Sequence, residues 1–354
     1  MIIGLLGASG FVGRHVRAEA ERRGHTVLTA QAPRLDVPAP SGVGRAWKRA
    51  SLAAWAGACA QELESLAGSE EAERLRLLGT ESDVIVNAAG LASPEGHELS
   101  SLMGANALLP AMLAVQSGAP LLHLSSAAVL GAGTLHARPE TAPFSDYSAS
   151  KALGERLVRE HGRMPACVLR ATSVQGPERP TTQRFAAFAR SRWAGCAEDA
   201  PTPLTSAASL ARLVTGIAED LAESRSVPET VLQPWEGATT LSAIRAARGH
   251  GSAVPMHIPR TLARLAVRAG HALGTALGSG AARGDGSGRA AHAAGRVGQR
   301  AAAVTRRAEL LWFGQAQEDA WPRAAELAGA REVLDVLAQA GQAVSGGGTR
   351  GEQP

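Results

Sequence analysis

The chain has 354 residues, of which 45% are hydrophobic, enough for one large domain or two interleaved domains with a sizeable core. Its formal net charge of +4 is modest and only 3% of its residues are aromatic, so the sequence lacks the basic surface and the stacking side chains of a nucleic-acid-binding protein. The three cysteines show no metal-ligand spacing, so we expect buried thiols and no metal site.

The N-terminus shows neither the charged segment nor the cleavage site of a signal peptide, and no apolar run approaches the length of a membrane span. We therefore expect a cytoplasmic protein that has no membrane span, does not bind nucleic acid and binds a small-molecule substrate. The first element expected in chain order is a strand at residues 1–6.

Glycines follow this strand at once, with the spacing G-x-x-G-x-x-G, and a helix comes next. Glycines let the backbone approach a pyrophosphate, whose charge then lies at the positive N-terminal end of the helix. The spacing alone is weak in a chain with 40 glycines, but its place between a strand and a helix predicts dinucleotide binding. The loop residues expected to contact the dinucleotide are Gly7, Ser9, Gly10, Phe11, Val12 and Gly13.

A second strand is expected at residues 24–30, and its end bears on the choice of cofactor. An acidic side chain there would bind the ribose hydroxyls of NAD, whereas a basic one would favour the 2′-phosphate of NADP. Residues 29–34 contain no acid and end at Arg34, and Arg14 is also available. The sequence therefore favours NADP over NAD.

Strands and helices alternate further along the chain, which predicts an α/β fold. Strands are expected at 83–90, 121–126, 166–170 and 230–235, and helices at 47–78, 105–116, 147–160 and 204–221. Strands joined by helical crossovers form a parallel sheet that is covered on both faces. Ligands of such sheets bind beyond the carboxyl ends of the strands, where Gly7, Gly90, Ser126 and Thr172 would all lie.

Tyr147 is the only tyrosine in the chain, and Lys151 is one of only two lysines. Four residues apart on a helix, the two side chains lie on one face and can reach one bound molecule. A neighbouring ammonium lowers the pKa of a phenol, which makes it an acid/base group near neutral pH. The spacing alone could be a coincidence, so its meaning depends on the rest of the chain.

Six elements in order carry a resemblance to a known family. They are the glycine loop, Asp83-Val-Ile-Val-Asn87-Ala-Ala-Gly90, Asn106, Ser125-Ser126-Ala-Ala-Val-Leu-Gly131, Tyr147-Ser-Ala-Ser-Lys151, and Leu169-Arg170-Ala-Thr-Ser-Val-Gln-Gly176-Pro177. From residue 1 to about 177, the chain resembles an extended short-chain dehydrogenase/reductase, of the group also called the NAD-dependent epimerase/dehydratase family. The resemblance implies a Rossmann-type doubly wound parallel sheet within residues 1–180, completed by 204–245.

The resemblance also implies catalytic roles. Tyr147 would exchange a proton with a substrate oxygen as hydride moves to or from the nicotinamide, and Lys151 would hold the nicotinamide ribose and lower the pKa of the tyrosine. Ser126, which counting back from Gly131 favours over Ser125, would hydrogen-bond the substrate oxygen. Asn106 would support the active site, although an asparagine can also be a local helix cap.

Further cofactor contacts follow from the same resemblance. The residues concerned are Asp36, Ala88, Ala89, Gly90 and Thr172, in addition to the glycine loop, Arg34 and Lys151. Asp36 matches the aspartate with which the family contacts the adenine, rather than a ribose ligand. The family often pairs through two helices, so a homodimer is compatible with the sequence.

Some positions depart from the family pattern. The family's sugar-nucleotide dehydratases carry Asp-Glu after the active-site hydroxyl residue, where this chain has Ala127 and Ala128, so 4,6-dehydratase activity is not expected. The tyrosine of the usual Val-Tyr-Gly is Leu130, and the asparagine that often faces a substrate diphosphate is Ser173. These departures put a standard nucleotide-sugar site in doubt.

Residues 181–345 are expected to form a smaller, mainly helical substrate-side region. A basic amphipathic helix from residue 259 to 273 could cover the substrate site or lie on a membrane surface, and we expect the first. A flexible Gly/Ala/Arg-rich excursion is expected at 278–298, and a disordered tail at 346–354.

Three functions stay open on the sequence. The first is an NAD(P)-dependent oxidoreductase, with NADP favoured, that acts on a carbonyl or alcohol substrate such as a sugar or nucleotide-sugar. The second is a sugar-nucleotide epimerase that retains NAD, and the third is a dinucleotide-binding protein without catalysis. The complete set of Ser126, Tyr147 and Lys151 argues against the third.

Overall fold

The computed structural model describes residues 1–41, 47, 49–92, 97–249, 255–283, 289–318 and 321–346. The chain forms two compact units. The first unit consists of Met1–Val174, Ala207–Pro234 and Glu318–Ala330, and the second of Gln175–Ser206, Trp235–Gln317 and Arg331–Pro354. The expected division near residue 180 therefore lies close to the first crossing between the units, but the chain returns to the first unit twice.

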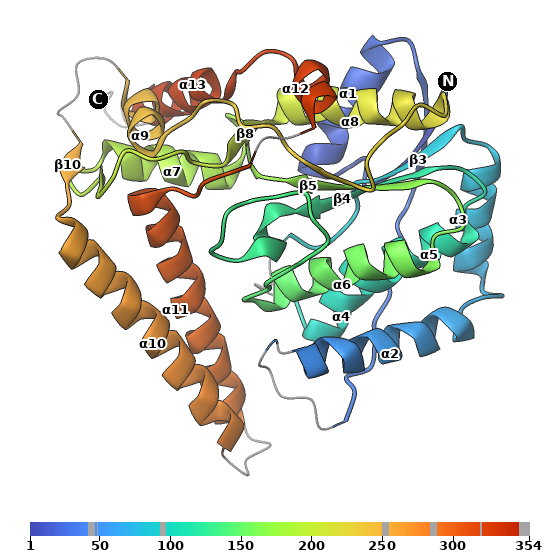
Figure 1. The fold of residues 1–354 in the computed structure, drawn as a ribbon, viewed down its shortest axis with the longest axis horizontal. Helices are drawn as coiled ribbons and strands as arrows, with labels where there is room; N and C mark the ends of the chain where they lie inside the picture. The colour runs from blue at the N-terminus through green and yellow to red at the C-terminus, as the bar shows by residue number, and fades with distance from the viewer. Residues whose placement is uncertain are drawn as a thin grey trace, which may run out of the picture. The chain divides into compact units, whose positions relative to one another are not determined.

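A six-stranded parallel sheet forms the centre of the first unit, with the strand order β2-β1-β3-β4-β5-β9 (Figure 1). Its strands are β1 (Ile2–Leu6), β2 (Thr26–Ala30), β3 (Val84–Asn87), β4 (Leu121–Ser126), β5 (Ala166–Ala171) and β9 (Thr230–Leu232). The predicted Rossmann-type parallel sheet is confirmed. The strand order reverses between β1 and β3, and sheets of this kind bind ligands at such a reversal.

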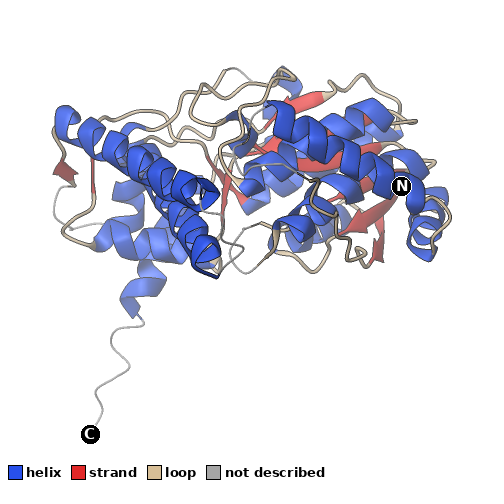
Figure 2. Cartoon of the chain, turned by 90° about the horizontal axis from the view of Figure 1, so that it is seen from below, coloured by secondary structure: helices blue, strands red, loops and turns tan. Residues whose placement is uncertain are grey.

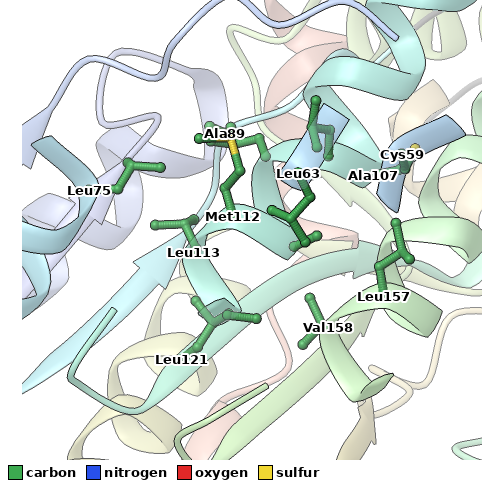
Figure 3. Packing of buried hydrophobic residues seen from close by; sticks show 14 of the residues in the cluster. Cys59, Leu63, Leu75, Ala89, Ala107, Met112, Leu113, Leu121, Leu157 and Val158 are labelled. Carbon is green, nitrogen blue, oxygen red and sulfur yellow. The ribbon is translucent and has the colours of Figure 1, made fainter. Parts of the chain in front are cut away.

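Helices cover both faces of the sheet in the first unit (Figure 1). One face carries α1 (Phe11–Arg22), α8 (Ala207–Ala222) and α12 (Pro322–Ala328). The other carries α2 (Arg49–Ser65), α3 (Glu70–Thr80), α4 (Leu99–Met103), a π-helix (Gly104–Leu108), α5 (Leu109–Gln116) and α6 (Asp146–His161). On this second face, Met112, Leu113 and Val158 belong to one buried cluster with Leu121 of the sheet (Figure 3).

One stretch departs from the expectation that no apolar run approaches a membrane span. Leu99–Gln116 comprises α4, the π-helix and α5. It is 18 residues long with a mean hydropathy of 1.3, so by length and composition it could cross a membrane. Of its residues, 67% are buried within the structure, and Leu109 and Met112 pack in the core of the first unit. The expectation was wrong about the sequence run, which serves as a core helix here.

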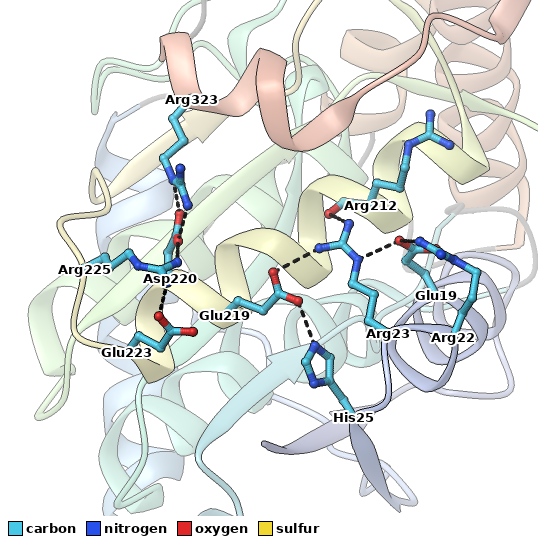
Figure 4. Close-up of polar contacts among 10 residues, drawn as sticks. All are labelled: Glu19, Arg22, Arg23, His25, Arg212, Glu219, Asp220, Glu223, Arg225 and Arg323. Atoms are coloured by element: carbon cyan, nitrogen blue, oxygen red, sulfur yellow. Dashed lines mark hydrogen bonds and ion pairs between the residues drawn. The ribbon is translucent and has the colours of Figure 1, made fainter.

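Ion pairs hold α12, although it comes from a distant part of the sequence, against α8 (Figure 4). Arg323 donates through Nε and Nη2 to the carboxylate of Asp220 at 2.5 and 2.6 Å, and Arg225 donates to it at 2.5 Å. Burial alone would raise the pKa of Asp220, but the hydrogen bonds from Arg323 and Arg225 outweigh it and lower the pKa. Arg212 of α8 also donates to the carbonyl of Ala328, at 2.8 Å.

The second unit is mainly helical, as the sequence predicted. Its elements are α7 (Pro180–Arg190), α9 (Thr240–Arg248), α10 (Arg260–Arg283), α11 (Arg289–Phe313), α13 (Val333–Gly346) and the short strands β7 (Gly195–Cys196), β8 (Leu204–Ser206) and β10 (Met256–His257). Another short strand, β6 (Ser173–Gln175), lies where the chain passes between the units.

Two expectations concern the C-terminal part of the chain, a flexible excursion and a disordered tail. Most of the segment expected to be a flexible excursion, 278–298, is helical, since α10 ends at Arg283 and α11 begins at Arg289. The disordered tail was expected at 346–354, but Gly346 is the last residue of α13, and residues 347–354 lie outside the described residues.

A pair of glycine substitutions tests the packing of α6 against the π-helix. A Cβ at Gly154 would overlap the carbonyl oxygen of Asn106, whereas a Cβ at Gly57 in α2 would meet no atom within 4 Å. Gly154→Ala should lower the free energy of unfolding by about 1–3 kcal/mol because the helices must move apart. Gly57→Ala should raise it by about 0.5–1 kcal/mol, as alanine favours a helix. Urea unfolding followed by circular dichroism measures both, and equal effects would contradict the close packing.

Candidate active site

The glycine loop lies where the strand order reverses. Gly7 follows β1 with a φ of +82°, a backbone conformation that other residues rarely adopt. A Cβ at Gly7 would lie 2.6 Å from the amide nitrogen of Ala89 and 2.7 Å from the carbonyl carbon of Ala88, both just past β3. A Cβ at Gly13 would overlap the carbonyl oxygen of Gly7. Side chains are therefore excluded between the loop, the start of α1 and residues 88–89.

The start of α1 fits an anionic group. Gly10 precedes the helix and supplies no side chain to cap it, and the first turn contains no acidic residue. Ser9 and Gly10 are exposed, whereas Phe11 and Val12 are half-buried. The amides at the helix start can therefore bind a phosphate, with the favourable field of the helix N-terminus. This geometry fits the pyrophosphate of a dinucleotide.

A pocket of about 420 Å³ lies beside the loop, between α1 and the end of β2. It is lined by Ala8, Ser9, Arg14, Arg17, Ala18, Glu21 and Thr29. Arg17 was missed by the sequence reasoning, although its position three residues after Arg14 on a helix places both on one face. Its Nε also donates to Glu21 at 2.7 Å.

Arg34 and Asp36 lie on an exposed segment after β2. Arg34 is not among the residues that line the pocket. Asp36 accepts a hydrogen bond from Ser101 Oγ at 2.5 Å, so its carboxylate is held by α4. The main chain between them packs tightly on the π-helix, because a Cβ at Gly104 would overlap the carbonyl oxygen of Leu35.

Asn106, Gly90 and Lys151 come together behind the end of β3. Gly90 has a φ of +152°, and a Cβ there would lie 2.6 Å from Asn106 Oδ1 and 3.0 Å from Lys151 Nζ. Asn106 is completely buried in the π-helix, where it donates to the Leu91 carbonyl and to Ser150 Oγ at 3.0 Å each and accepts from the Leu91 amide at 3.1 Å. It is therefore not a helix cap. Its amide ties the chain after β3 to α6.

The two residues of the Tyr-x-x-x-Lys spacing lie on α6. Ser145 and Ser148 form a capping box that fixes where the helix begins. Half-buried Tyr147 follows in the first turn, and Lys151 lies one turn further, buried, with Nζ donating to the Leu124 carbonyl at 3.0 Å. Burial lowers the pKa of Lys151 to about 8, although Glu155 acts in the opposite direction.

The neighbouring serines at the end of β4 have different partners. Ser125 is buried and donates its hydroxyl hydrogen to Glu155 Oε1 at 2.6 Å. Ser126 accepts from the Ala128 amide at 3.2 Å, which leaves its own hydroxyl hydrogen for another acceptor. Thr172, just past β5, has a buried Oγ1 with no hydrogen-bond partner among the described residues.

A buried ion pair beneath this site was missed by the sequence reasoning. Glu155 and Arg170 are both completely buried, and Arg170 Nη2 donates to Glu155 Oε2 at 2.7 Å. Arg170 Nη1 also donates to the carbonyls of His136 and Arg138, at 3.0 and 2.6 Å. The signal in the sequence was the spacing of Glu155, four residues after Lys151 on the same helix face.

His123 is a second buried titratable group near Lys151. It has no exposed surface, and its pKa lies well below the ordinary value, first because of burial and then because of the Lys151 charge. Asn87 Nδ2 lies 3.3 Å from His123 Nδ1, and Asn87 Oδ1 accepts from the Ala89 amide at 3.1 Å. Asn87 thus donates to a neutral His123. The imidazole therefore adds no positive charge next to the Lys151 ammonium.

A model of the NAD dependent epimerase/dehydratase family matches residues 3–205. A search of curated proteins gave no match. Among solved structures, the chain is similar to the terminal R domain from the myxalamid PKS-NRPS biosynthetic pathway, with 16% identity and a TM-score of 0.58, covering 100% of this chain and 92% of that one.

Two further structures show weaker similarity. The dTDP-4-dehydrorhamnose reductase of Bacillus anthracis str. Ames, in complex with NADP, has 15% identity and a TM-score of 0.49 over 73% of this chain and 85% of that one. The UDP-glucuronic acid 4-epimerase of Bacillus cereus, in complex with NAD, has 19% identity and a TM-score of 0.49 over 73% and 87%.

The family model covers more than half of the chain, and its range contains the glycine loop, the reversal of strand order and the residues gathered around Lys151. The resemblance found in the sequence is thereby confirmed. The chain belongs to the NAD dependent epimerase/dehydratase family, and it is an NAD(P)-dependent enzyme of the extended short-chain dehydrogenase/reductase type.

Proposed function

We propose that this protein is an NADP-dependent oxidoreductase that interconverts a carbonyl and an alcohol, with a sugar or nucleotide-sugar as a candidate substrate class. The observation that carries the proposal is the burial of the Lys151 ammonium against the Leu124 carbonyl, one helical turn from Tyr147 and beside Gly90 and Asn106. A buried ammonium beside a phenol suits proton transfer at a substrate oxygen.

Each residue of the site has a distinct task in this proposal. Gly7, Gly10 and Gly13 hold the pyrophosphate at the start of α1, and residues 88–90 and Thr172 line the cofactor further on. The bound dinucleotide supplies or accepts the hydride. Tyr147 gives a proton to the substrate oxygen during reduction and takes it back during oxidation.

Two residues act on charge at the reacting oxygen. Lys151 favours the phenolate form of Tyr147 through its positive charge and binds the nicotinamide ribose. Ser126 donates its hydroxyl hydrogen to the oxygen on which negative charge develops. This role suits Ser126 better than Ser125, whose hydrogen is already donated to Glu155. Asn106 positions the helix that carries Tyr147 and Lys151.

The pocket beside the loop supports NADP. Arg14 and Arg17 bring two guanidinium groups to the end of β2, with the hydroxyls of Ser9 and Thr29. Glu21 also lines this pocket and pairs with Arg17, so Arg14 is the guanidinium that carries the proposal, and no acidic residue ends the strand. Arginine forks and hydroxyls match a phosphate better than a ribose diol. Ala127 and Ala128, where related dehydratases carry Asp and Glu, provide no acid for the elimination of water, so we do not propose a 4,6-dehydratase.

Replacing Tyr147 by Phe tests the enzymatic function. The variant should lose about 10²- to 10⁴-fold in turnover, because it lacks the proton donor, while its affinity for NADPH stays unchanged. The measurement is NADPH oxidation on a panel of sugars, nucleotide-sugars and simple ketones, with fluorescence titration of NADPH. Unchanged turnover by the variant would refute the assignment. If denaturing the wild-type protein releases about one NAD per chain, the epimerase alternative replaces the reductase.

The cofactor preference has its own test. Arg14→Gln should weaken NADPH binding by about tenfold or more and leave NADH binding unchanged, since one charge-assisted hydrogen bond contributes about 1.5–3 kcal/mol. Arg22→Gln is the matched control, because Arg22 is an exposed residue at the end of α1 that pairs with Glu19 and does not line the pocket. Equal loss of NADH and NADPH binding in Arg14→Gln would place the arginine at the pyrophosphate and remove the support for NADP.

The pH dependence of turnover tests the role of the buried pair. Burial lowers the pKa of Lys151 to about 8, and the charge of Glu155 keeps that pKa from falling further. Glu155→Gln should therefore lower the pKa of Lys151 and move the alkaline decline in turnover to lower pH. The variant also leaves Arg170 unpaired, which should cost about 3–5 kcal/mol of stability, so unfolding is measured alongside. Glu160→Gln, an exposed position on α6 paired with Arg156, should leave the pH profile unchanged. An unmoved profile in a folded Glu155→Gln protein would contradict the coupling.

A further inference from the structure

The helices α10 and α11 form a hairpin within the second unit, and they lie side by side in both views (Figures 1 and 2). Small residues of α10 allow the close approach. A Cβ at Gly270 would overlap Thr305 of α11, and a Cβ at Gly274 would lie 3.3 Å from the Ala302 amide nitrogen. Ala263 and Val267 of α10 are also buried. One side of α10 is thus covered by its partner helix.

A different side of α10 exposes large apolar side chains. Leu262, Leu265 and Leu273 are 59%, 60% and 55% exposed, and a group of exposed apolar side chains is informative where a single exposed leucine is not. Their spacing of three and eight residues places them on one strip of a helix that turns about 100° per residue. Ala266 and Ala269, also exposed, lie on the same strip.

A third side of α10 is basic. Arg264 and Arg268 are exposed, one turn apart, and neither is paired with a carboxylate among the described residues. The helix contains no aspartate or glutamate from Arg260 to Arg283. Among the arginine side chains of α10 that the structure describes, only Arg260 has an acidic partner, as it donates to Glu198 at 2.7 Å. The exposed surface of α10 therefore combines an apolar strip with uncompensated positive charge.

The sequence left two roles for this helix, and from its exposed surface we propose the second: α10 docks the protein peripherally on an anionic lipid bilayer, rather than covering the substrate site. Leu262, Leu265 and Leu273 would enter the boundary between headgroups and acyl chains, and Arg264 and Arg268 would bind lipid phosphates. An amphipathic helix with leucines on one face and arginines on another binds membranes in this way. Basic residues near an anionic surface add further attraction. The proposal does not depend on the enzymatic function.

A second copy of the chain fits this surface less well. Pairing two α10 strips would bring arginines of like charge together, with no carboxylate of α10 to compensate them. Three leucines and two alanines also offer far less than the roughly 1,200 Å² that a stable interface buries. A lipid surface supplies negative charge and needs no matching shape.

Vesicle co-sedimentation of the full chain tests the proposal. The protein should bind vesicles of phosphatidylcholine and phosphatidylserine, should bind pure phosphatidylcholine at least tenfold more weakly, and should be released by high salt. The double variants Leu262→Ser/Leu265→Ser and Arg264→Gln/Arg268→Gln should each lose at least tenfold in binding. Their matched controls on α3, Leu77→Ser and Arg74→Gln/Arg76→Gln, should bind as the wild type does.

Circular dichroism and NADPH titration of each variant establish that it is folded. The proposal is overturned if the protein does not bind anionic vesicles, or if the folded α10 variants bind them as well as the wild type does. Sedimentation velocity without lipid tests whether a second copy of the chain binds this surface instead. A dimer that the Leu262→Ser/Leu265→Ser variant dissociates, with no vesicle binding, would assign the surface to a second copy.

Discussion

The first unit depends on backbone segments that approach each other more closely than any side chain would allow. Gly7 and Gly13 bring the loop after β1 against residues 88–89, and Gly90 brings the end of β3 against Asn106 and Lys151. Gly154 does the same for α6 and the π-helix. Because these contacts follow one another from β1 to α6, close packing at glycines, together with the side-chain hydrogen bonds of Asn106, sets the position of Lys151 relative to the loop.

The most costly group in that arrangement is the ammonium of Lys151. An isolated buried charge costs several kcal/mol, and the structure compensates it with the Leu124 carbonyl and with Glu155 one turn away. Glu155 is itself neutralised by Arg170, whose remaining donors bind main-chain carbonyls. His123 stays neutral beside them. A balanced set of buried charges thus keeps one ammonium near the ends of β3 and β4, one helical turn from Tyr147 on α6.

The sequence predicted the sheet well because most of its strands are short, largely apolar runs that periodicity can locate. The glycine loop and the Tyr147–Lys151 spacing were recognisable for a similar reason, since their meaning depends on local order along the chain. Glu155 and Arg170 escaped notice because their pairing joins α6 to β5. The run Leu99–Gln116 was underestimated because its polar residues, such as Asn106, interrupt it without preventing burial. The return of residues 318–330 to the first unit depends on tertiary contacts, which no local sequence pattern indicates.

That return has a consequence for the order in which the protein is made. The ion pairs of Asp220 join α8 to Arg323, which lies about a hundred residues later in the chain, and the whole hairpin of α10 and α11 is synthesised between them. On the ribosome, the sheet and its glycine contacts can form early, but the face that carries α1 and α8 stays without α12 until residue 330 has left the exit tunnel. While these roughly one hundred residues are synthesised, the surface of α8 that α12 later covers lacks its partner helix.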